Sequence, residues 1–234
     1  MKRVLFFLFV AIFALSTSAQ GGNRDSGNNA SATPLQVSVS GNISADNFVK
    51  GTVGTVTFNR FPANVNEWKQ VREQIGGTMP GAVALQIMAC ELFRRNNNAG
   101  AECIKLNTVS NQVKSYTGLV KSLFRRSRPY QYAAYLKGAS WDNGYNPTKP
   151  YVITVEVGAT SNIAYSNSYQ TNIYGLFVKS NGHEMQDGWQ PVSVMVTAKP
   201  GEPGEGKYYI IFASSSIFLQ CKEKSFTAAF NGLD

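Results

Sequence analysis

The side chains best suited to bind a ligand cluster between Arg128 and Pro147, where tyrosine and tryptophan recur. Such rings combine a large apolar face with a polar group, which suits protein interfaces, and the same faces can stack on sugar rings. The helical spacing within the segment favours a second interpretation, in which the rings seal the junction of helix and sheet. Both interpretations stay open, and we expect Trp141 and Tyr145 to be the most exposed rings of the segment. The candidate ligand-binding residues are Tyr130, Tyr132, Tyr135, Trp141 and Tyr145.

The chain has a single histidine, His183, in a Gly-bounded segment that also holds Glu184 and Asp187. A zinc site usually combines three or four such ligands in a fixed geometry. This segment is predicted to be an exposed turn between strands, so we expect no metal site and no cofactor. A catalytic triad would need His183 as its base, and no nucleophile motif accompanies it.

Paired carboxylates are the other common hydrolytic device. The 14 acidic residues are spread over predicted helices and turns, and only Glu156 and Asp142 merit testing as such a pair. No Gly-rich loop follows a strand and opens a helix, so nucleotide binding is not supported. The sequence therefore specifies no catalytic residue.

Residues 1–19 have the pattern of a cleaved secretory signal. Lys2 and Arg3 precede an apolar run that ends at Leu15, and Thr17 and Ala19 supply small residues at the cleavage positions. The apolar run is too short to span a bilayer. We therefore expect an exported protein, periplasmic or secreted, with no transmembrane segment after removal of the signal peptide.

The charge of the chain narrows its possible binding partners. The net charge is +8 at pH 7, but charged residues make up only 15% of the chain. Basic pairs such as Arg94 and Arg95 suit the last turn of a helix, so we expect no nucleic-acid site.

The chain has three cysteines, Cys90, Cys103 and Cys221. They allow either three buried thiols or a disulfide bridge between Cys90 and Cys103.

The elements that must position these residues follow from hydrophobic periodicity. Residues 20–34 are rich in Gly, Asn and Ser and predict a flexible leader. Alternating apolar residues predict two early strands, and helical spacing then predicts a run of helices that begins with the capping pattern of Asn64 and Glu67. The predicted helices cover roughly 65–75, 80–95, a short stretch around 103, and 109–123.

From Tyr151 onward the hydrophobic period changes from 3.6 to 2, as in strands. Helices followed by strands with hairpin-length connections predict an α+β fold, with helices packed on a mainly antiparallel β-sheet. We assign residues 35–234 to a single such domain. The predicted late strands are 151–157, 173–179, 192–197, 207–213 and 217–221.

Part of this pattern resembles a known family. The residues Gly138-Ala139, Asn143-Gly144-Tyr145, Pro147 and Pro150-Tyr151 are similar to the signature of an uncharacterised bacterial family, a domain of unknown function, here as an exported member. The resemblance extends over about residues 52–222 and departs after Lys179, where 182–187 replace a shorter turn. These are turn and packing residues, so the resemblance implies a shared fold and no catalytic role.

The sequence favours an exported, non-enzymatic binding or interaction domain of the cell envelope, with a glycan or an envelope protein as partner. The alternative is a hydrolase acting on cell-envelope or environmental polysaccharide or peptide. Exposed Trp141 and Tyr145 would favour binding. A cleft in which two polar side chains converge would favour hydrolysis.

Overall fold

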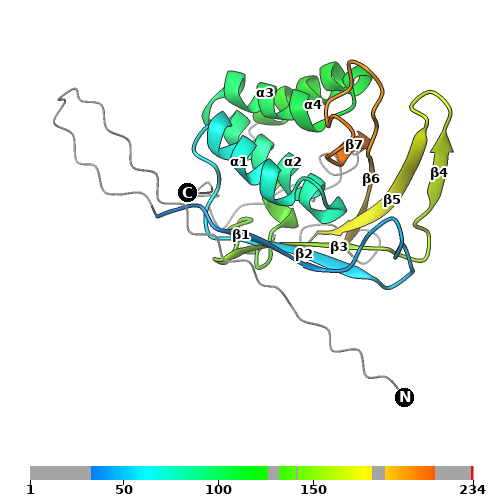
Figure 1. Ribbon diagram of the computed structural model, residues 1–234. Coiled ribbons are helices and arrows are strands. Elements are labelled where there is room, and N and C mark those ends of the chain that lie inside the picture. The colour runs from blue at the N-terminus through cyan, green and yellow to red at the C-terminus, as the bar shows by residue number, and fades with distance from the viewer. Residues whose placement is uncertain (1–32, 126–131, 141, 181–187, 214–232, 234) are drawn as a thin grey trace. The chain divides into compact units, whose positions relative to one another are not determined.

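The computed structural model describes residues 33–125, 132–140, 142–180, 188–213 and 233 (Figure 1). The chain divides into two units, residues 1–34 and residues 35–234, and every element described below belongs to the second unit. In chain order these elements are β1 (Val37–Gly41), β2 (Val53–Phe58), α1 (Val65–Ile75), α2 (Met79–Arg95), α3 (Asn97–Asn107), the 3-10 turn η1 (Ser110–Gln112), α4 (Val113–Arg125), the 3-10 turn η2 (Ala133–Tyr135), β3 (Tyr151–Glu156), β4 (Ile163–Ser166), β5 (Thr171–Lys179), β6 (Trp189–Met195) and β7 (Ile210–Ala213).

The strands form one antiparallel sheet in the order β1-β2-β3-β5-β6-β7, with β4 beside β5. In Figure 1 the sheet bends around the helices, since β1 to β3 run beneath α1 and α2 while β5 and β6 rise beside them. β6 pairs with one side of β5 along its length, so β3 and β4 share the other side. The predicted α+β class, with helices on a mainly antiparallel sheet, is confirmed.

The first two helices begin where the sequence places helix caps. The Asn64 side chain accepts a hydrogen bond from the Glu67 backbone N–H at 3.0 Å, as the capping pattern predicts. The Thr78 hydroxyl accepts one from the Gly81 N–H at 3.0 Å, and Pro80 occupies the first turn of α2, where a missing N–H costs no helical bond.

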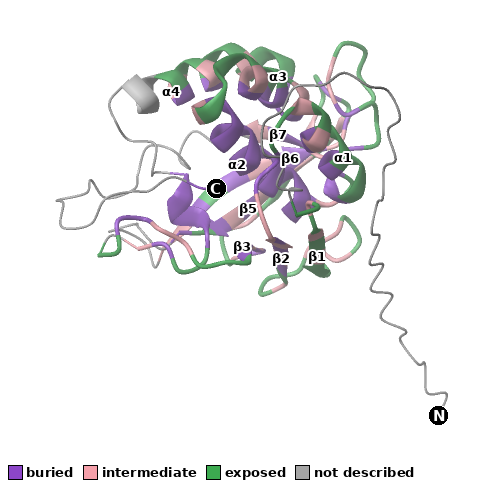
Figure 2. Ribbon diagram, turned by 90° about the vertical axis from the view of Figure 1, so that its left-hand side faces the viewer, coloured by how far each residue is buried: buried purple, intermediate pink, exposed green. Residues whose placement is uncertain are grey.

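Helix α2 is the centre of the core, because every residue from Met79 to Phe93 is buried. Figure 2 shows buried residues concentrated on α2, with further buried residues along the strands. Trp68 on α1 is fully buried and its indole N–H donates to the Leu85 carbonyl at 3.0 Å, which fixes α1 on α2. A helix buried all round needs apolar residues on every face, and residues 79–93 are apolar except for Gln86 and Glu91, whose side chains are hydrogen-bonded in the core.

Two sequence predictions need correction. The thiols of Cys90 and Cys103 are buried and free, so the predicted alternative of a bridge between them is wrong. The helix around Cys103 is also longer than expected, because Asn96 caps it by accepting from the N–H groups of Asn98 and Ala99. The predicted strand at 217–221, Cys221 and the leader at 20–32 lie outside the described residues.

Candidate functional site

Three of the five predicted ligand-binding residues belong to the core. Tyr132, Tyr135 and Tyr145 are 0%, 1% and 0% exposed. Tyr130 and Trp141 lie outside the described residues. The expected exposure of Tyr145 is therefore wrong, and for the three described tyrosines the packing alternative fits the structure.

Tyr145 is buried because the loop around it folds inward. Its backbone is left-handed, with φ at 63°, and its N–H donates to the Ser140 carbonyl at 2.7 Å. The Asn143 side chain closes the same loop, since its amide donates to the carbonyls of Gly138 and Asn146 at 2.7 and 2.9 Å. A polar turn residue thus directs the aromatic ring into the core, which composition alone does not reveal.

Tyr132 is held by a buried carboxylate on α2. Its hydroxyl donates to Glu91, and Arg94 donates two hydrogen bonds to the same carboxylate at 2.7 and 2.9 Å. Arg95 lies 3.3 Å from it. Burial, and then the Glu91 charge, raises the pKa of Tyr132 well above its usual range. Two guanidinium groups and a hydroxyl thus compensate the buried charge of the Glu91 carboxylate, which would destabilise the fold if it had no partners.

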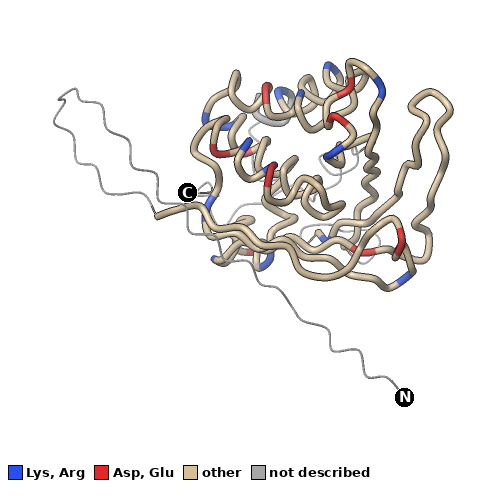
Figure 3. The backbone as a smooth tube through the Cα atoms, viewed as in Figure 1, with Lys and Arg blue, Asp and Glu red and all other residues tan. Residues whose placement is uncertain are grey.

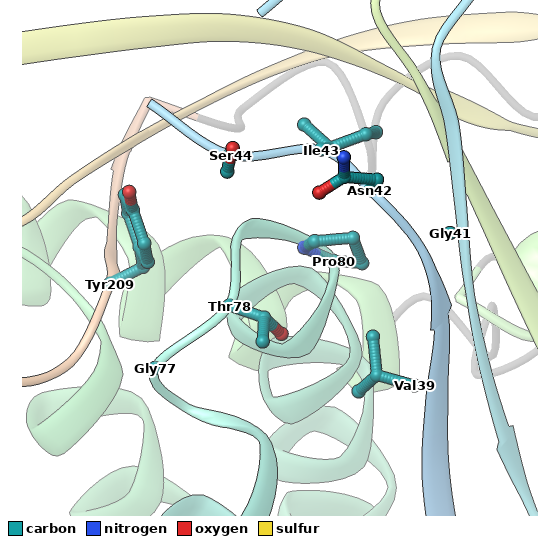
Figure 4. Close-up of a pocket in the computed structure, with 9 residues that line it drawn as sticks. All are labelled: Val39, Gly41, Asn42, Ile43, Ser44, Gly77, Thr78, Pro80 and Tyr209. Atoms are coloured by element: carbon teal, nitrogen blue, oxygen red, sulfur yellow. The ribbon is translucent and has the colours of Figure 1, made fainter. Parts of the chain in front are cut away.

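A pocket of about 220 Å³ lies elsewhere, between the β1–β2 loop, the α1–α2 turn and the residue before β7. Figure 4 shows Tyr209 and Val39 on opposite sides of it, with Pro80 between them. Three segments distant in the sequence build the lining. The lining residues are Val39, Gly41, Asn42, Ile43, Ser44, Gly77, Thr78, Pro80 and Tyr209.

The loop side of the pocket depends on Gly41. Its φ is 90°, and a Cβ there would lie 2.1 Å from the Val53 carbonyl oxygen, so only glycine allows the chain to leave β1 at this angle. Asn47 then holds the loop, because its side chain donates to the Asn42 carbonyl at 2.7 Å and its N–H donates to the Ser44 hydroxyl oxygen at 3.1 Å.

Tyr209 is positioned by its neighbours in the sequence. Its N–H donates to the Gly76 carbonyl at 2.9 Å. The preceding Tyr208 has the Arg72 guanidinium 4.3 Å from its ring centre and donates from its hydroxyl to Glu73. These contacts tie the segment before β7 to α1 and to the α1–α2 turn, and so hold Tyr209 in the pocket lining.

An aromatic row continues from the pocket to Tyr174 on β5 and back to Phe48 in the β1–β2 loop. The Tyr209 ring lies 6.2 Å from that of Tyr174, which lies 5.3 Å from that of Phe48. Burial, and then the proximity of Tyr174 and Asp46, raises the pKa of Tyr209. Its hydroxyl therefore stays protonated at neutral pH, where it can both donate and accept a hydrogen bond.

The N-terminus of α2 adds little attraction for an anion, although it borders the pocket. The Gly81 N–H is already bonded to the Thr78 hydroxyl, which itself donates to the Ile75 carbonyl at 2.8 Å. Pro80 has no N–H to offer. The pocket thus combines apolar surface with neutral hydroxyl and amide groups, and none of its lining residues carries a charge.

The predicted polar candidates lie away from this pocket. Glu156 stands at the end of β3 opposite Val53, Asp142 is in an exposed turn, and neither is among the lining residues. Within the described residues no three His, Cys, Asp or Glu side chains gather as metal ligands. His183 and its acidic neighbours lie outside that part of the chain.

No helix that the structure describes is long and apolar enough to cross a membrane.

The sequence did not single out the pocket residues, since each is ordinary in its own segment. The signals that could have found them are local: Gly41 at the end of a strand, and Gly76-Gly77-Thr78 between two helices. Only the folded chain brings them beside Tyr209.

Comparison with known proteins gives a family for the chain. No curated protein and no solved structure matches it significantly. The family model for a domain of unknown function, DUF6935, matches residues 60–225. This range contains the helices, the later strands and four of the nine pocket-lining residues, Gly77, Thr78, Pro80 and Tyr209. Because the match covers most of the chain, this protein belongs to the DUF6935 family.

Proposed function

We propose that this protein is an exported, non-enzymatic binding domain that holds a neutral, hydroxyl-rich ligand, a glycan of the cell envelope, in the pocket beside Tyr209. The observation that carries the proposal is the lining itself: a tyrosine, a proline and aliphatic groups stand among hydroxyl and amide side chains. The signal-like pattern of residues 1–19 supports export.

The chemistry of the lining favours a neutral ligand. Asn42, Ser44 and Tyr209 can exchange hydrogen bonds with hydroxyl groups, and the Tyr209 and Pro80 rings offer apolar surface to the face of a sugar ring. Sites for drug-sized ligands enclose roughly 300–1,000 Å³. A pocket of about 220 Å³ suits one ring of a ligand whose remainder stays outside.

Binding fits this lining better than hydrolysis does. Glycoside hydrolysis commonly requires two carboxyl groups roughly 5 to 9.5 Å apart on either side of the scissile bond. Tyr209 is the single ionisable side chain among the nine lining residues, and its raised pKa makes it a poor base at neutral pH.

The test is a thermal-shift screen against neutral envelope glycan fragments, with anionic polymers for comparison. A ligand at a hundredfold excess over its Kd stabilises the folded state by about 2.7 kcal/mol, which raises the Tm of a domain of this size by about 5 to 11 °C. We expect a neutral glycan to produce such a shift and Tyr209→Ala to abolish it.

Tyr165→Ala is the matched control, because Tyr165 is 63% exposed and lies outside the pocket lining. It should keep the shift. A response only to anionic polymers, a shift that survives Tyr209→Ala, or no shift with any neutral glycan would contradict the proposal.

Export is tested separately by cell fractionation and N-terminal sequencing. The exported protein should begin at Gln20, after cleavage behind Ala19. Recovery of the chain from the cytoplasm with residues 1–19 still attached would contradict this part of the proposal.

A further inference from the structure

Strand β4 (Ile163–Ser166) is an open edge of the sheet in the part of the chain that the structure describes. It pairs with β5 alone among the described residues, from Ile163 opposite Tyr174 to Ser166 opposite Thr171. Figure 1 shows it at the margin of the sheet, away from the helices. An edge of this kind presents unpaired backbone N–H and C=O groups to any strand that approaches it.

The side chains of this edge are unusually apolar for an exposed strand. Ile163 is 47% exposed and Tyr165 is 63% exposed. Residues two apart in a strand share a face of the sheet, so these two lie side by side, on the same face as Tyr174. Ala164 is also exposed, on the opposite face.

The edge lacks the charges that usually keep strands apart. No Lys, Arg, Asp or Glu occurs between Glu156 and Lys179, and Figure 3 shows the β4–β5 hairpin free of charged residues. Proteins commonly protect an exposed edge with lysine or proline, and β4 contains neither. The whole chain carries a net charge of +8, so an uncharged edge is where two copies meet with least repulsion.

We propose that two copies of this chain join through β4, antiparallel and edge to edge, with Ala164 opposite Ala164 of the second copy. This register places Ile163 opposite Tyr165 of the second copy, and twofold symmetry repeats the pair. Aromatic and β-branched residues are favourable cross-strand partners. The edge is therefore complementary to itself, which distinguishes a second copy from an unrelated strand as its partner.

The test is sedimentation equilibrium on protein purified from cells expressing the full chain, from about 1 µM to about 1 mM, a range that covers small and weak interfaces. The average mass should rise with concentration towards twice that of one chain. Ala164→Lys places two ammonium groups directly opposite each other in the proposed register, so this variant should stay monomeric. Ser38→Lys, at an exposed position on the edge strand β1, is the matched control and should associate like the unmodified protein.

A charge exchange tests the register itself. Ala164→Glu alone should also stay monomeric, whereas a mixture of the Ala164→Lys and Ala164→Glu proteins should recover the doubled mass. Because residue 164 is exposed, thermal unfolding should show all variants folded. A monomeric unmodified protein across the whole range, association of Ala164→Lys like the unmodified chain, or no recovery in the mixture would overturn the proposal.

Discussion

The hydroxyl of Tyr132 offers the sharpest test of whether the aromatic segment is part of the core. Tyr132 and Glu91 are both 0% exposed, and the hydroxyl donates to the Glu91 carboxylate. Tyr132→Phe removes this one oxygen and keeps the ring, so packing is unchanged. A hydrogen bond to a charged group contributes about 1.5 to 3 kcal/mol, and we expect the free energy of unfolding to fall by that amount.

The assay is urea unfolding, with the midpoint and the slope fitted separately. A lower midpoint at an unchanged slope reports lost stability, whereas an altered slope reports a change in the denatured or native state. The expected loss corresponds to a Tm lower by about 3 to 12 °C for a domain of this size. Tyr165→Phe is the matched control, because that tyrosine is 63% exposed and should change stability by less than about 0.5 kcal/mol.

A Tyr132→Phe protein as stable as the unmodified one would contradict a structural role for this hydroxyl. The Tyr132 hydroxyl would then contribute nothing to the fold, and the aromatic segment would again be open to a role in ligand binding. A loss of stability in the expected range would tie Tyr132 to the core through Glu91.

Three further predictions concern packing and charge. Gly100→Ala should destabilise the protein by about 1 to 3 kcal/mol in urea unfolding, because its Cβ would lie 2.2 Å from the α2 backbone, whereas Gly118→Ala on α4, with open space around it, should stabilise by up to about 1 kcal/mol. Burial raises the pKa of the Cys103 thiol to about 12, so thiol labelling at pH 8, followed by peptide mass spectrometry, should modify it only after unfolding. The hydrogen bonds from Arg60 lower the pKa of Glu67. The ionised Glu67 carboxylate therefore stabilises the fold at pH values above its ordinary pKa, and this stabilisation is lost as the pH falls through the lowered pKa. Glu67→Gln should reduce the free energy of unfolding by about 1 kcal/mol at pH 7, and the difference from the unmodified protein should vanish in strong acid.

Most of the fold could be predicted from hydrophobic periodicity. Apolar residues at helical spacing in α2 and at alternate positions in β3 are signals of burial, and the structure buries these residues. β4 was not predicted, because Ile163 and Tyr165 are exposed and no residue from 158 to 168 is buried, so no buried face imposes a pattern there. An exposed strand is specified by its backbone pairing with β5, which no local pattern records.

The candidate site was harder to predict than the fold. Aromatic composition pointed to the segment around Tyr132 and Tyr145, but composition does not say which way a ring faces. That direction depends on the Glu91 carboxylate and on the turn closed by Asn143. The pocket beside Tyr209 depends on three chain segments meeting, and long-range contacts of this kind leave no trace in residue spacing.

The most direct test of the proposed site is amide NMR mapping with the neutral glycan that gives the largest thermal shift. Binding in this pocket should give saturable shifts confined to the amides of the β1–β2 loop around Asn42 and Ser44, of the α1–α2 turn at Gly77 and Thr78, and of Tyr209. Shifts that leave these amides unchanged and instead cover residues 138–146, or any other surface, would contradict it.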